Sequence, residues 1–519
     1  EQMISMATAT SMAVWDPKTG EKLSSLPTEN ELIQNISISD DGKWMSGGGF
    51  YGILKLWNLE EGTLVKRMTG HAGGIYGTDI SPENRWVASV GMDGSFRIWD
   101  IASGDQLHLQ EKAHEVIASD VQFSPDGQYL ATCGWDTLIH IWKVGTWEKV
   151  RTLTGHSNSI LSLDWHENSR YLATSSGNNS VWRADNSVRV WDTETGEMIC
   201  HYKGHLNNVQ RVLFMDDGNK AVSCGDDGAI RVWDFEECSE VASLLSVNAT
   251  DHIIVTPDRY YAASKDALKA VSFRIGDKLY PFEMYDLWLN RPDLVMGAIG
   301  RSPEGLINAY YYVYQKRLKR MGYTEDDIGG DFHLPELDLD KKDIPLITQD
   351  SIIRLPVTVS DERYALDRIM VYVNDVPLYA SNGIDLSGEK EQQLKYTVPI
   401  RLLPGENQVQ VSVLNEKGAE SLRRSFSVIR DVEHPGNRLF LVTIGVSEYE
   451  NEEFNLQYAA KDARDIAATI SQAGGIYEEV NHLSLLNEEV TLEALEKVKE
   501  FLSQAEPEDV VILFIAGHG

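Results

Sequence analysis

The chain has 519 residues, of which 42% are hydrophobic and 24% charged, and its formal net charge at pH 7 is −32. Single hydrophobic cores rarely exceed roughly 300 residues, so we expect a folded protein of about two to four domains. The acidic surface repels phosphate backbones, which argues against nucleic acid as a partner. Apolar runs such as residues 510–517 are too short to span a bilayer, so we expect no membrane helix in this sequence.

The four cysteines are Cys133, Cys200, Cys224 and Cys238. They are too few for a disulfide scaffold, and none forms a CxxC pair of the metal or redox type. Their position in strand-like segments predicts small buried hydrophobic side chains. The cysteines leave the redox compartment open. We expect a cytoplasmic location, but export stays open because the sequence begins at Glu1 rather than Met.

A tryptophan recurs through the first half of the chain at spacings of 42, 42, 43, 49 and 42 residues. These tryptophans are Trp15, Trp57, Trp99, Trp142, Trp191 and Trp233. Most are followed by Asp or Asn, and Gly-His pairs stand upstream at residues 70–71, 155–156 and 204–205. Turn residues separate short alternating segments between these marks, which predicts repeated units of short strands.

This pattern resembles the WD40 family over about residues 1–280. In that family each repeat is a four-stranded blade that buries its faces only against its neighbours. The resemblance implies a seven-bladed β-propeller, with Phe273 in the tryptophan position of a seventh unit and a first unit that starts in mid-blade. It also implies that His71, Asp93 and Trp99 form a buried hydrogen-bond network, a structural role rather than a metal or catalytic site.

The 49-residue spacing reflects an insertion at residues 178–186 that contains Trp182 and Arg183. Insertions of this kind map to one rim of a propeller, and a Trp–Arg pair on a loop is typical of protein-binding surfaces. One hypothesis is therefore that Trp182 and Arg183 bind a protein partner. The alternative is a tolerated hairpin extension whose tryptophan covers a neighbouring blade.

Residues 281–349 are expected to form a helical connector and an acidic linker. Ser302-Pro303-Glu304 is typical of a helix start, apolar residues then recur at helical spacing, and Gly322 fits the stop. Residues 350–432 alternate strand-like segments and turns without helices, and this segment resembles an immunoglobulin-like β-sandwich. It carries no recognisable chemistry, so we expect a spacer or binding module.

Residues 433–519 alternate strands and helices, which predicts a parallel sheet covered on both faces. The predicted elements are strands at Arg438–Val446, Val480–Leu485 and Asp509–Ile515, and helices at Gln457–Gln472 and Thr491–Gln504. Sites in such sheets form outside the carboxyl ends of strands. His518 follows the last strand and is flanked by glycines, which leaves its imidazole open to a substrate.

Three stretches in this order, residues 441–446, 459–463 and 511–519, resemble the caspase and metacaspase superfamily. A bacterial protein that joins a WD40 propeller to a caspase-like domain is similar in layout. The resemblance implies that His518 assists a cysteine nucleophile and that the backbone of Gly519 helps to stabilise the oxyanion. The nucleophile would lie at the end of the next strand, beyond residue 519, so these residues alone lack it.

Specificity rests on Asp462, which matches the aspartate that lines an acidic S1 pocket in metacaspases. This resemblance implies Arg or Lys at the P1 position of the substrate. Leu456 stands where caspases that cleave after Asp carry an arginine, which argues against an acidic P1. The alternative is that Asp462 only caps or pairs near the start of its helix.

We therefore expect the intact protein to be a caspase-like cysteine endopeptidase that cleaves a protein substrate and is regulated by a partner at the propeller. The alternative is a non-catalytic interaction scaffold with a dead caspase-like fold. A nucleotide-binding domain is disfavoured, because residues 445–448 lack the phosphate-binding glycines. No cofactor or metal is predicted; calcium activation stays open but no residue seen here supports it.

Overall fold

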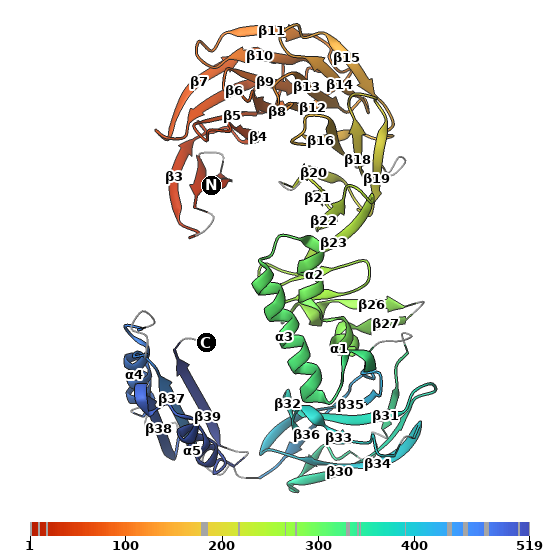
Figure 1. The fold of residues 1–519 in the computed structure, drawn as a ribbon, viewed down its shortest axis with the longest axis vertical. Helices are drawn as coiled ribbons and strands as arrows, with labels where there is room; N and C mark the ends of the chain where they lie inside the picture. The colour runs from red at the N-terminus through yellow and green to blue at the C-terminus, as the bar shows by residue number, and fades with distance from the viewer. Residues whose placement is uncertain are drawn as a thin grey trace. The chain divides into compact units, whose positions relative to one another are not determined.

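The computed structural model describes residues 3–8, 11–16, 19–177, 185–215, 218–264, 266–275, 278–328, 333–339, 342, 344–389, 391–432, 438–449, 455–471, 477–506 and 509–517. The chain separates into two compact units, one of residues 1–271 with 289–312 and the other of residues 272–288 with 313–519 (Figure 1). Among the described residues, no helix is long and apolar enough to cross a membrane.

The first unit consists of antiparallel sheets that follow one another in chain order, here called blades 1 to 6. Blade 1 contains β1 (Met3–Thr8), β2 (Ser11–Trp15) and β3 (Lys22–Pro27). Blade 2 contains β4 (Ile33–Ile38), β5 (Trp44–Gly49), β6 (Ile53–Asn58) and β7 (Thr63–Thr69). Blade 3 contains β8 (Ile75–Ile80), β9 (Trp86–Gly91), β10 (Phe96–Asp100) and β11 (Gln106–Gln110). Blade 4 contains β12 (Ala118–Phe123), β13 (Tyr129–Gly134), β14 (Ile139–Lys143) and β15 (Lys149–Leu153). Blade 5 contains β16 (Ile160–Trp165), β17 (Tyr171–Ser176), β18 (Ser187–Asp192) and β19 (Met198–Lys203). Blade 6 contains β20 (Val209–Phe214), β21 (Lys220–Gly225), β22 (Ala229–Asp234) and β23 (Ser239–Ser246).

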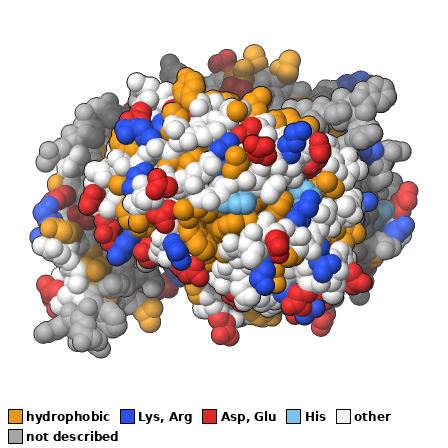
Figure 2. Space-filling view, turned by 90° about the horizontal axis from the view of Figure 1, so that it is seen from above, with side chains coloured by type: hydrophobic (Ala, Val, Ile, Leu, Met, Phe, Trp, Pro, Cys, Tyr) orange, Lys and Arg blue, Asp and Glu red, His pale blue; other side chains and the backbone are white. Residues whose placement is uncertain are grey.

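The hydrophobic cores lie between blades, as the repeat pattern predicts. One core joins Ile141 of β14 to Leu163 of β16 and Trp191 of β18, so blades 4 and 5 bury their faces against each other. The first strands of blades 2 to 6 contact one another in succession, which places them at the inner side of the stack. Figure 2 looks onto the outer strands of blades 3 and 4, where hydrophobic side chains reach the surface between charges of both signs. These features are those of a propeller-type stack.

The predicted seventh blade is wrong for the described residues. β24 (His252–Val255) and β25 (Tyr261–Ala263) extend blade 6 instead, with β24 paired to β23. The cause is a tight turn in which Val247 N–H donates to the Asp251 carbonyl, at 2.8 Å, and returns the chain to the outermost strand. Phe273 lies in the hairpin of β26 (Ser272–Ile275) and β27 (Lys278–Pro281), which is a separate two-stranded sheet.

The prediction that all cysteines are small buried side chains is also wrong in part. Cys200 and Cys238 form a disulfide, and Cys238 lies in an exposed turn. Cys133 is buried and Cys224 half-buried, and both are free thiols. Strand-like sequence around a cysteine therefore does not exclude a partner contributed by the neighbouring repeat.

Three helices follow the blades: α1 (Asp286–Leu289), α2 (Pro292–Ile299) and α3 (Glu304–Met321). The predicted long helix is confirmed by α3, and Gly322 follows it in the left-handed conformation with φ 77°. Only part of the apolar stripe at helical spacing is buried, since Tyr314 and Leu318 are buried whereas Leu306 and Tyr310 are exposed.

Two sheets in the second unit share one hydrophobic core. Their strands are β28 (Glu336–Leu339), β30 (Ile352–Ser360) and β34 (Gln393–Arg401) in one, and β29 (Ile347–Thr348), β36 (Arg424–Arg430), β35 (Gly405–Asn415), β31 (Leu366–Val373), β32 (Val376–Pro377) and β33 (Ile384–Asp385) in the other. Val357 of β30 and Val411 of β35 meet in that core. β28 lies within the expected linker and pairs with β30 as an edge strand. Its buried Leu337 alternates with exposed acidic residues, which is the pattern of a strand with one buried face.

The C-terminal segment is a parallel sheet with helices, as strand–helix alternation predicts. Its elements are β37 (Arg438–Gly445), α4 (Ala459–Ser471), β38 (Glu479–Leu486), α5 (Leu492–Leu502) and β39 (Val510–Ala516). The strand order is β38-β37-β39, and both pairings are parallel. Thr491 caps α5, because its hydroxyl accepts the Ala494 N–H at 3.1 Å. The carboxyl ends of β37 and β39 therefore lie at one edge of the sheet.

Candidate functional site: the inner side of the blades

The predicted network of His71, Asp93 and Trp99 is present. His71 Nδ1 lies 3.0 Å from an Asp93 carboxylate oxygen, and the Trp99 indole donates to the Ser89 hydroxyl that contacts His71 Nε2. The same arrangement recurs in three further blades, with His114, Asp136, Thr132 and Trp142; His156, Asp185, Thr174 and Trp191; and His205, Asp227, Ser223 and Trp233. These groups satisfy one another, so the network is structural.

Blade 4 adds His140 to this network, and the ligand atoms of His114, Asp136 and His140 lie within 4.8 Å of one another. Both nitrogens of His114 are already engaged, with Asp136 and with the Thr132 hydroxyl. His140 stacks on His114, and burial together with that neighbour lowers the pKa of His140 to about 4. A metal ion would have to break the network, so this cluster fits a structural role.

The first strand of each of blades 2 to 6 contains a bulge at its second residue. Pairing to the next strand shifts by one residue at the same place in all of them. The skipped residues are Gln34, Tyr76, Ser119, Leu161 and Gln210. A bulge re-aims the side chain of the extra residue. All five line one pocket of about 420 Å³ at the inner side of the blades, here called the mouth pocket.

The mouth pocket combines aromatic, amide and charged groups. Tyr76 and Trp135 meet edge to face with ring centroids 6.5 Å apart. Arg211, whose side chain is 46% exposed, donates to the buried Asp120 carboxylate at 3.0 Å. The Gln210 amide donates to Asp226 at 3.0 Å. A partner segment here would meet an aromatic edge beside hydrogen-bonding groups, which is the make-up of a protein-recognition site.

The loops between the second and third strands of the blades carry exposed side chains next to this pocket. Trp135 lies in that loop of blade 4, and Tyr51 and Met92 occupy the same loops of blades 2 and 3. Trp182 and Arg183 belong by sequence to the corresponding loop of blade 5, but both lie outside the described residues. Their role in partner binding therefore stays a prediction.

Buried carboxylates join the first strands of neighbouring blades. Asp79 accepts the Phe123 N–H at 2.8 Å, Asp120 accepts the Leu163 N–H at 3.2 Å, and Asp164 accepts the Phe214 N–H at 2.7 Å. Burial raises the pKa of Asp79 to about 7 and that of Asp164 to about 6, and it also raises the pKa of Asp120. Each carboxylate holds the next blade in place beside the mouth pocket.

The predicted catalytic residues His518 and Gly519 lie outside the described residues. β39 ends at Ala516, two residues before His518. Asp462 is exposed in the first turn of α4, where the helix dipole favours a carboxylate, and α4 follows the carboxyl end of β37. The structure therefore describes one member of the proposed peptidase site and leaves its geometry to experiment.

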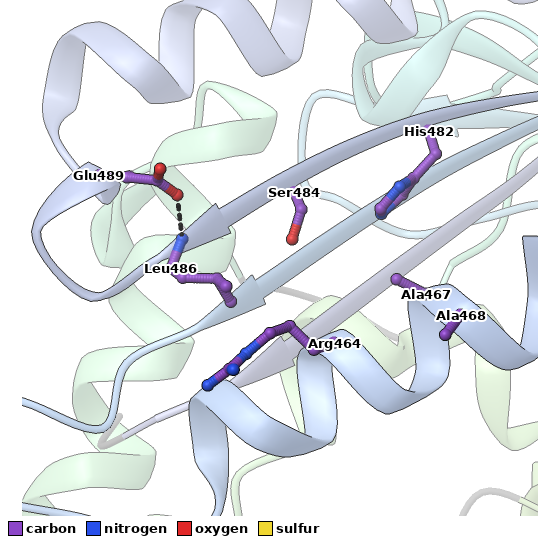
Figure 3. Close-up of a pocket in the computed structure, with 7 residues that line it drawn as sticks. All are labelled: Arg464, Ala467, Ala468, His482, Ser484, Leu486 and Glu489. Carbon is purple, nitrogen blue, oxygen red and sulfur yellow. Dashed lines mark hydrogen bonds between the residues drawn. The ribbon is translucent and has the colours of Figure 1, made fainter.

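A second pocket, of about 480 Å³, lies between α4 and the edge strand β38 (Figure 3). Arg464 reaches along it toward Leu486, with Ser484 and His482 further along the strand. The Leu486 N–H donates to the Glu489 carboxylate at 2.9 Å. Asp462 does not line this pocket.

Sequence reasoning missed the five bulged residues that line the mouth pocket. A signal was available, because each directly follows the apolar residue that opens an inner strand and varies from repeat to repeat. The carboxylates Asp79, Asp120 and Asp164 give no comparable signal, since each contacts a backbone N–H of the next repeat.

Four WD40 repeats lie within residues 62–234 of the first unit. The model of the WD domain, G-beta repeat, matches residues 62–100, 106–143, 147–192 and 196–234. Each match contains the outermost strand of one blade and the first three strands of the next, from β7 to β22. The matches end at residue 234, so the assignments of the later segments stay predictions.

Parts of the chain are similar to curated relatives. The chain is 33% identical over 107 residues to nuclear distribution protein PAC1 of Arthroderma otae, covering 20% of this chain and 23% of the relative. It is 27% identical over 182 residues to MST50-interacting protein 11 of Pyricularia oryzae (34% and 52%), and 27% identical over 123 residues to small ribosomal subunit protein RACK1 of Neurospora crassa (23% and 36%). These relatives are fungal, and the chain spans from about a fifth to half of their length.

Proposed function

We propose that the blades form a protein-binding scaffold and that a segment of the partner docks in the mouth pocket. The observation that carries this proposal is the convergence of five bulged residues, one from each of blades 2 to 6, on one pocket. Repeats need only their cores to stack, so side chains re-aimed into a common pocket are available for recognition.

The composition of the pocket favours a protein partner. Tyr76 and Trp135 offer apolar area on rigid rings, while Gln34 and Gln210 offer amide groups for backbone recognition. Exposed aromatic and apolar loop residues, such as Tyr51, extend this surface. The name of MST50-interacting protein 11 records that this relative contacts another protein, which supports the same role for the repeats of this chain.

Peptide display tests the scaffold proposal directly. A peptide selected from a random display library on the immobilised chain is the probe, and its affinity is measured by calorimetry. Trp135→Ala and Tyr76→Ala should each weaken binding by tenfold or more, because hot-spot residues contribute most of such an interaction. Leu107→Ala on β11 is the control, since Leu107 is exposed but away from the pocket lining. Selected peptides that bind all three variants equally would contradict the proposal.

The second candidate is a caspase-like cysteine endopeptidase in the intact protein, regulated by the scaffold. In this proposal His518 assists a cysteine beyond residue 519, and the Gly519 backbone stabilises the oxyanion. The supporting observation is the parallel pairing of β37 and β39, which places their carboxyl ends at the same edge of the sheet. Asp462 lies in the first turn of α4, which follows β37 in the chain. Asp462 would favour Arg or Lys at P1.

A peptidase assay separates the two candidates. The intact protein should cleave Arg- or Lys-P1 reporter peptides, His518→Ala should abolish cleavage, and Asp462→Asn should raise KM more than it lowers kcat. Glu493→Gln, in the exposed first turn of α5, is the matched control. Cleavage that survives His518→Ala would reject this candidate, as would a preference for Asp at P1.

A further inference from the structure

In each of blades 1 to 6, the turn after the strand that carries the repeat tryptophan contains a residue with positive φ. It lies five positions after the repeat tryptophan in each case, at Gly20, Gly62, Gly104, Trp147, Gly196 and Cys238, with φ between 53° and 84°. Glycine adopts this conformation without steric cost, whereas other residues are strained there. Trp147 and Cys238 therefore occupy a glycine position, which indicates that their side chains do something that glycine cannot.

At Gly104 and Gly196 a side chain would reach the preceding blade, whereas a Cβ atom at Gly20 or Gly62 meets no atom within 4 Å. A Cβ atom at Gly104 would lie 3.2 Å from Lys66 of blade 2. Trp147 shows what such a side chain does, because its ring lies 5.8 Å from Trp86 and stacks on His108 at 5.7 Å, both in blade 3. Trp147 thus joins blade 4 to blade 3 by ring packing.

Cys238 makes the corresponding junction covalently. It is bonded to Cys200 on β19, the outermost strand of blade 5, with a Cα–Cα distance of 5.3 Å that is normal for a disulfide. Cys238 is exposed whereas Cys200 is buried, so a soluble oxidant reaches Cys238 first. Cys133 has no such access, and its burial raises the pKa of its thiol, which keeps it unreactive.

The two blades that the disulfide joins also line the mouth pocket through their inner strands. Blade 5 contributes Ser159 and Leu161 to the pocket, and blade 6 contributes Asn208, Gln210 and Arg211. At the inner side, the Asp164 carboxylate of blade 5 accepts the Phe214 N–H of blade 6. The disulfide adds a second attachment at the outer strands, so oxidation fixes the two blades at both edges.

We propose that Cys200 and Cys238 are a reversible thiol–disulfide site whose oxidation locks blades 5 and 6 together and alters partner binding at the mouth pocket. The effect on binding rests on the scaffold function proposed above. Glutathione disulfide is the class of oxidant: the Cys238 thiolate attacks one of its sulfurs and releases a glutathione thiolate. The Cys200 thiolate then attacks the mixed disulfide at Cys238 and releases the second glutathione. Two protein thiols are oxidised, and one glutathione disulfide is reduced to two thiols.

Mass spectrometry tests the covalent site. The full chain is incubated with glutathione disulfide, alkylated and digested without reductant. A peptide pair joining Cys200 to Cys238, lighter by two hydrogen atoms than the free peptides, is expected in the native chain and in Cys224→Ser, which removes a free thiol of blade 6. Cys238→Gly, which restores the glycine of the other repeats, should give none. Alkylation of both cysteines in the oxidised native chain would overturn the proposal.

Thermal unfolding measures the attachment. Dithiothreitol should lower the Tm of the oxidised native chain and of Cys224→Ser by about 5 °C. The reason is that reduction opens the loop between the two cysteines and so raises the conformational entropy of the unfolded chain. Cys238→Gly should show no such shift. An equal shift in all three chains would mean that the reductant acts elsewhere and would reject the attachment.

Hydrogen exchange tests the link to the pocket without needing a ligand. Amides of residues 159–163 and 208–214 should exchange at least about threefold more slowly in the oxidised chain than in the reduced chain. Cys200→Ser should show no difference between the two conditions. Unchanged exchange with an intact disulfide would overturn the regulation. Failure of the scaffold proposal is a different result, in which pocket substitutions leave the affinity for the selected peptide unchanged.

Discussion

Two regions of the same blades hold aspartates whose pKa values are shifted in opposite directions. At the loop end, burial would raise the pKa of Asp93 and Asp185, but hydrogen bonds from histidine and backbone N–H groups hold both well below the usual range. On the inner strands, burial prevails and raises the pKa of Asp79 to about 7. The pKa of a carboxylate therefore depends on both its burial and its donors, since Asp79 is fully buried whereas Asp93 is half-buried and accepts a hydrogen bond from His71.

The largest effect is expected where a network aspartate is removed. Asp185→Ala leaves two buried cationic or polar partners, His156 and Arg189, without the carboxylate that each contacts at 3.1 Å. The free energy of unfolding of the first unit should fall by about 3 kcal/mol or more. Urea unfolding of the full chain, followed by tryptophan fluorescence, measures it. Asp40→Ala, at an exposed site, is the control, and an equally small loss in both variants would contradict the network's role.

The inner strands should give a pH dependence of the opposite kind to the loops. The pKa of Asp79 is higher in the folded chain than its ordinary 3.8, so the folded state binds more protons and stability falls as pH rises from about 4 to 7. Asp79→Asn keeps an acceptor for the Phe123 N–H but cannot ionise. Between pH 5 and pH 8 the free energy of unfolding should therefore fall by about 2 kcal/mol less in the variant than in the native chain. Urea unfolding at both pH values measures this difference. A decrease that matches the native chain would show that Asp79 is not the group responsible.

The loop-end aspartates should show the reverse trend at low pH. The pKa of Asp93 is lowered in the folded chain, so its contribution is present above the ordinary value of 3.8 and is lost as pH falls toward the folded value. Between pH 5 and pH 3 the native chain should lose about 1 kcal/mol more than Asp93→Asn does. The same urea series extended to pH 3 measures this, with Asp40→Asn as the control that follows the native curve.

Sequence patterns predict the loop-end region far better than the inner one, and the reason is physical. His71, Asp93 and Trp99 belong to one repeat, so their spacing recurs and can be read. Asp79 instead contacts the backbone of Phe123, 44 residues later in the next blade, and backbone N–H groups leave no mark in a sequence. The bulges that build the mouth pocket are likewise irregularities of strand pairing, invisible to hydrophobic periodicity.

Elsewhere, alternation of strands and helices suffices to predict the parallel C-terminal sheet, because its apolar strands and amphipathic helices are long and distinct. The same logic fails after β23, where a turn closed by Asp251 returns β24 to the outer strand, and the described residues form no seventh blade. Periodicity predicts that a strand exists but not which neighbour it pairs with. The predicted peptidase residues His518 and Gly519 lie outside the described residues, so that assignment stays a prediction.

The smallest change in stability is expected at Arg211, which contacts one of two buried carboxylates on the inner strands, Asp120 but not Asp79. Asp120 differs from Asp79 in facing a cation, Arg211, at 3.0 Å, and Arg211 lowers the pKa that burial raises. Arg211→Gln should therefore destabilise the first unit more at pH 8 than at pH 5, by about 0.5 kcal/mol, since Arg211 is half exposed and solvent screens the pair. Arg151→Gln is the matched control, because Arg151 also joins two blades but donates to the backbone carbonyls of Glu194 and Thr195 rather than to a carboxylate. Its effect should not change with pH, and an equal pH dependence in both variants would mean that Arg211 does not act on Asp120.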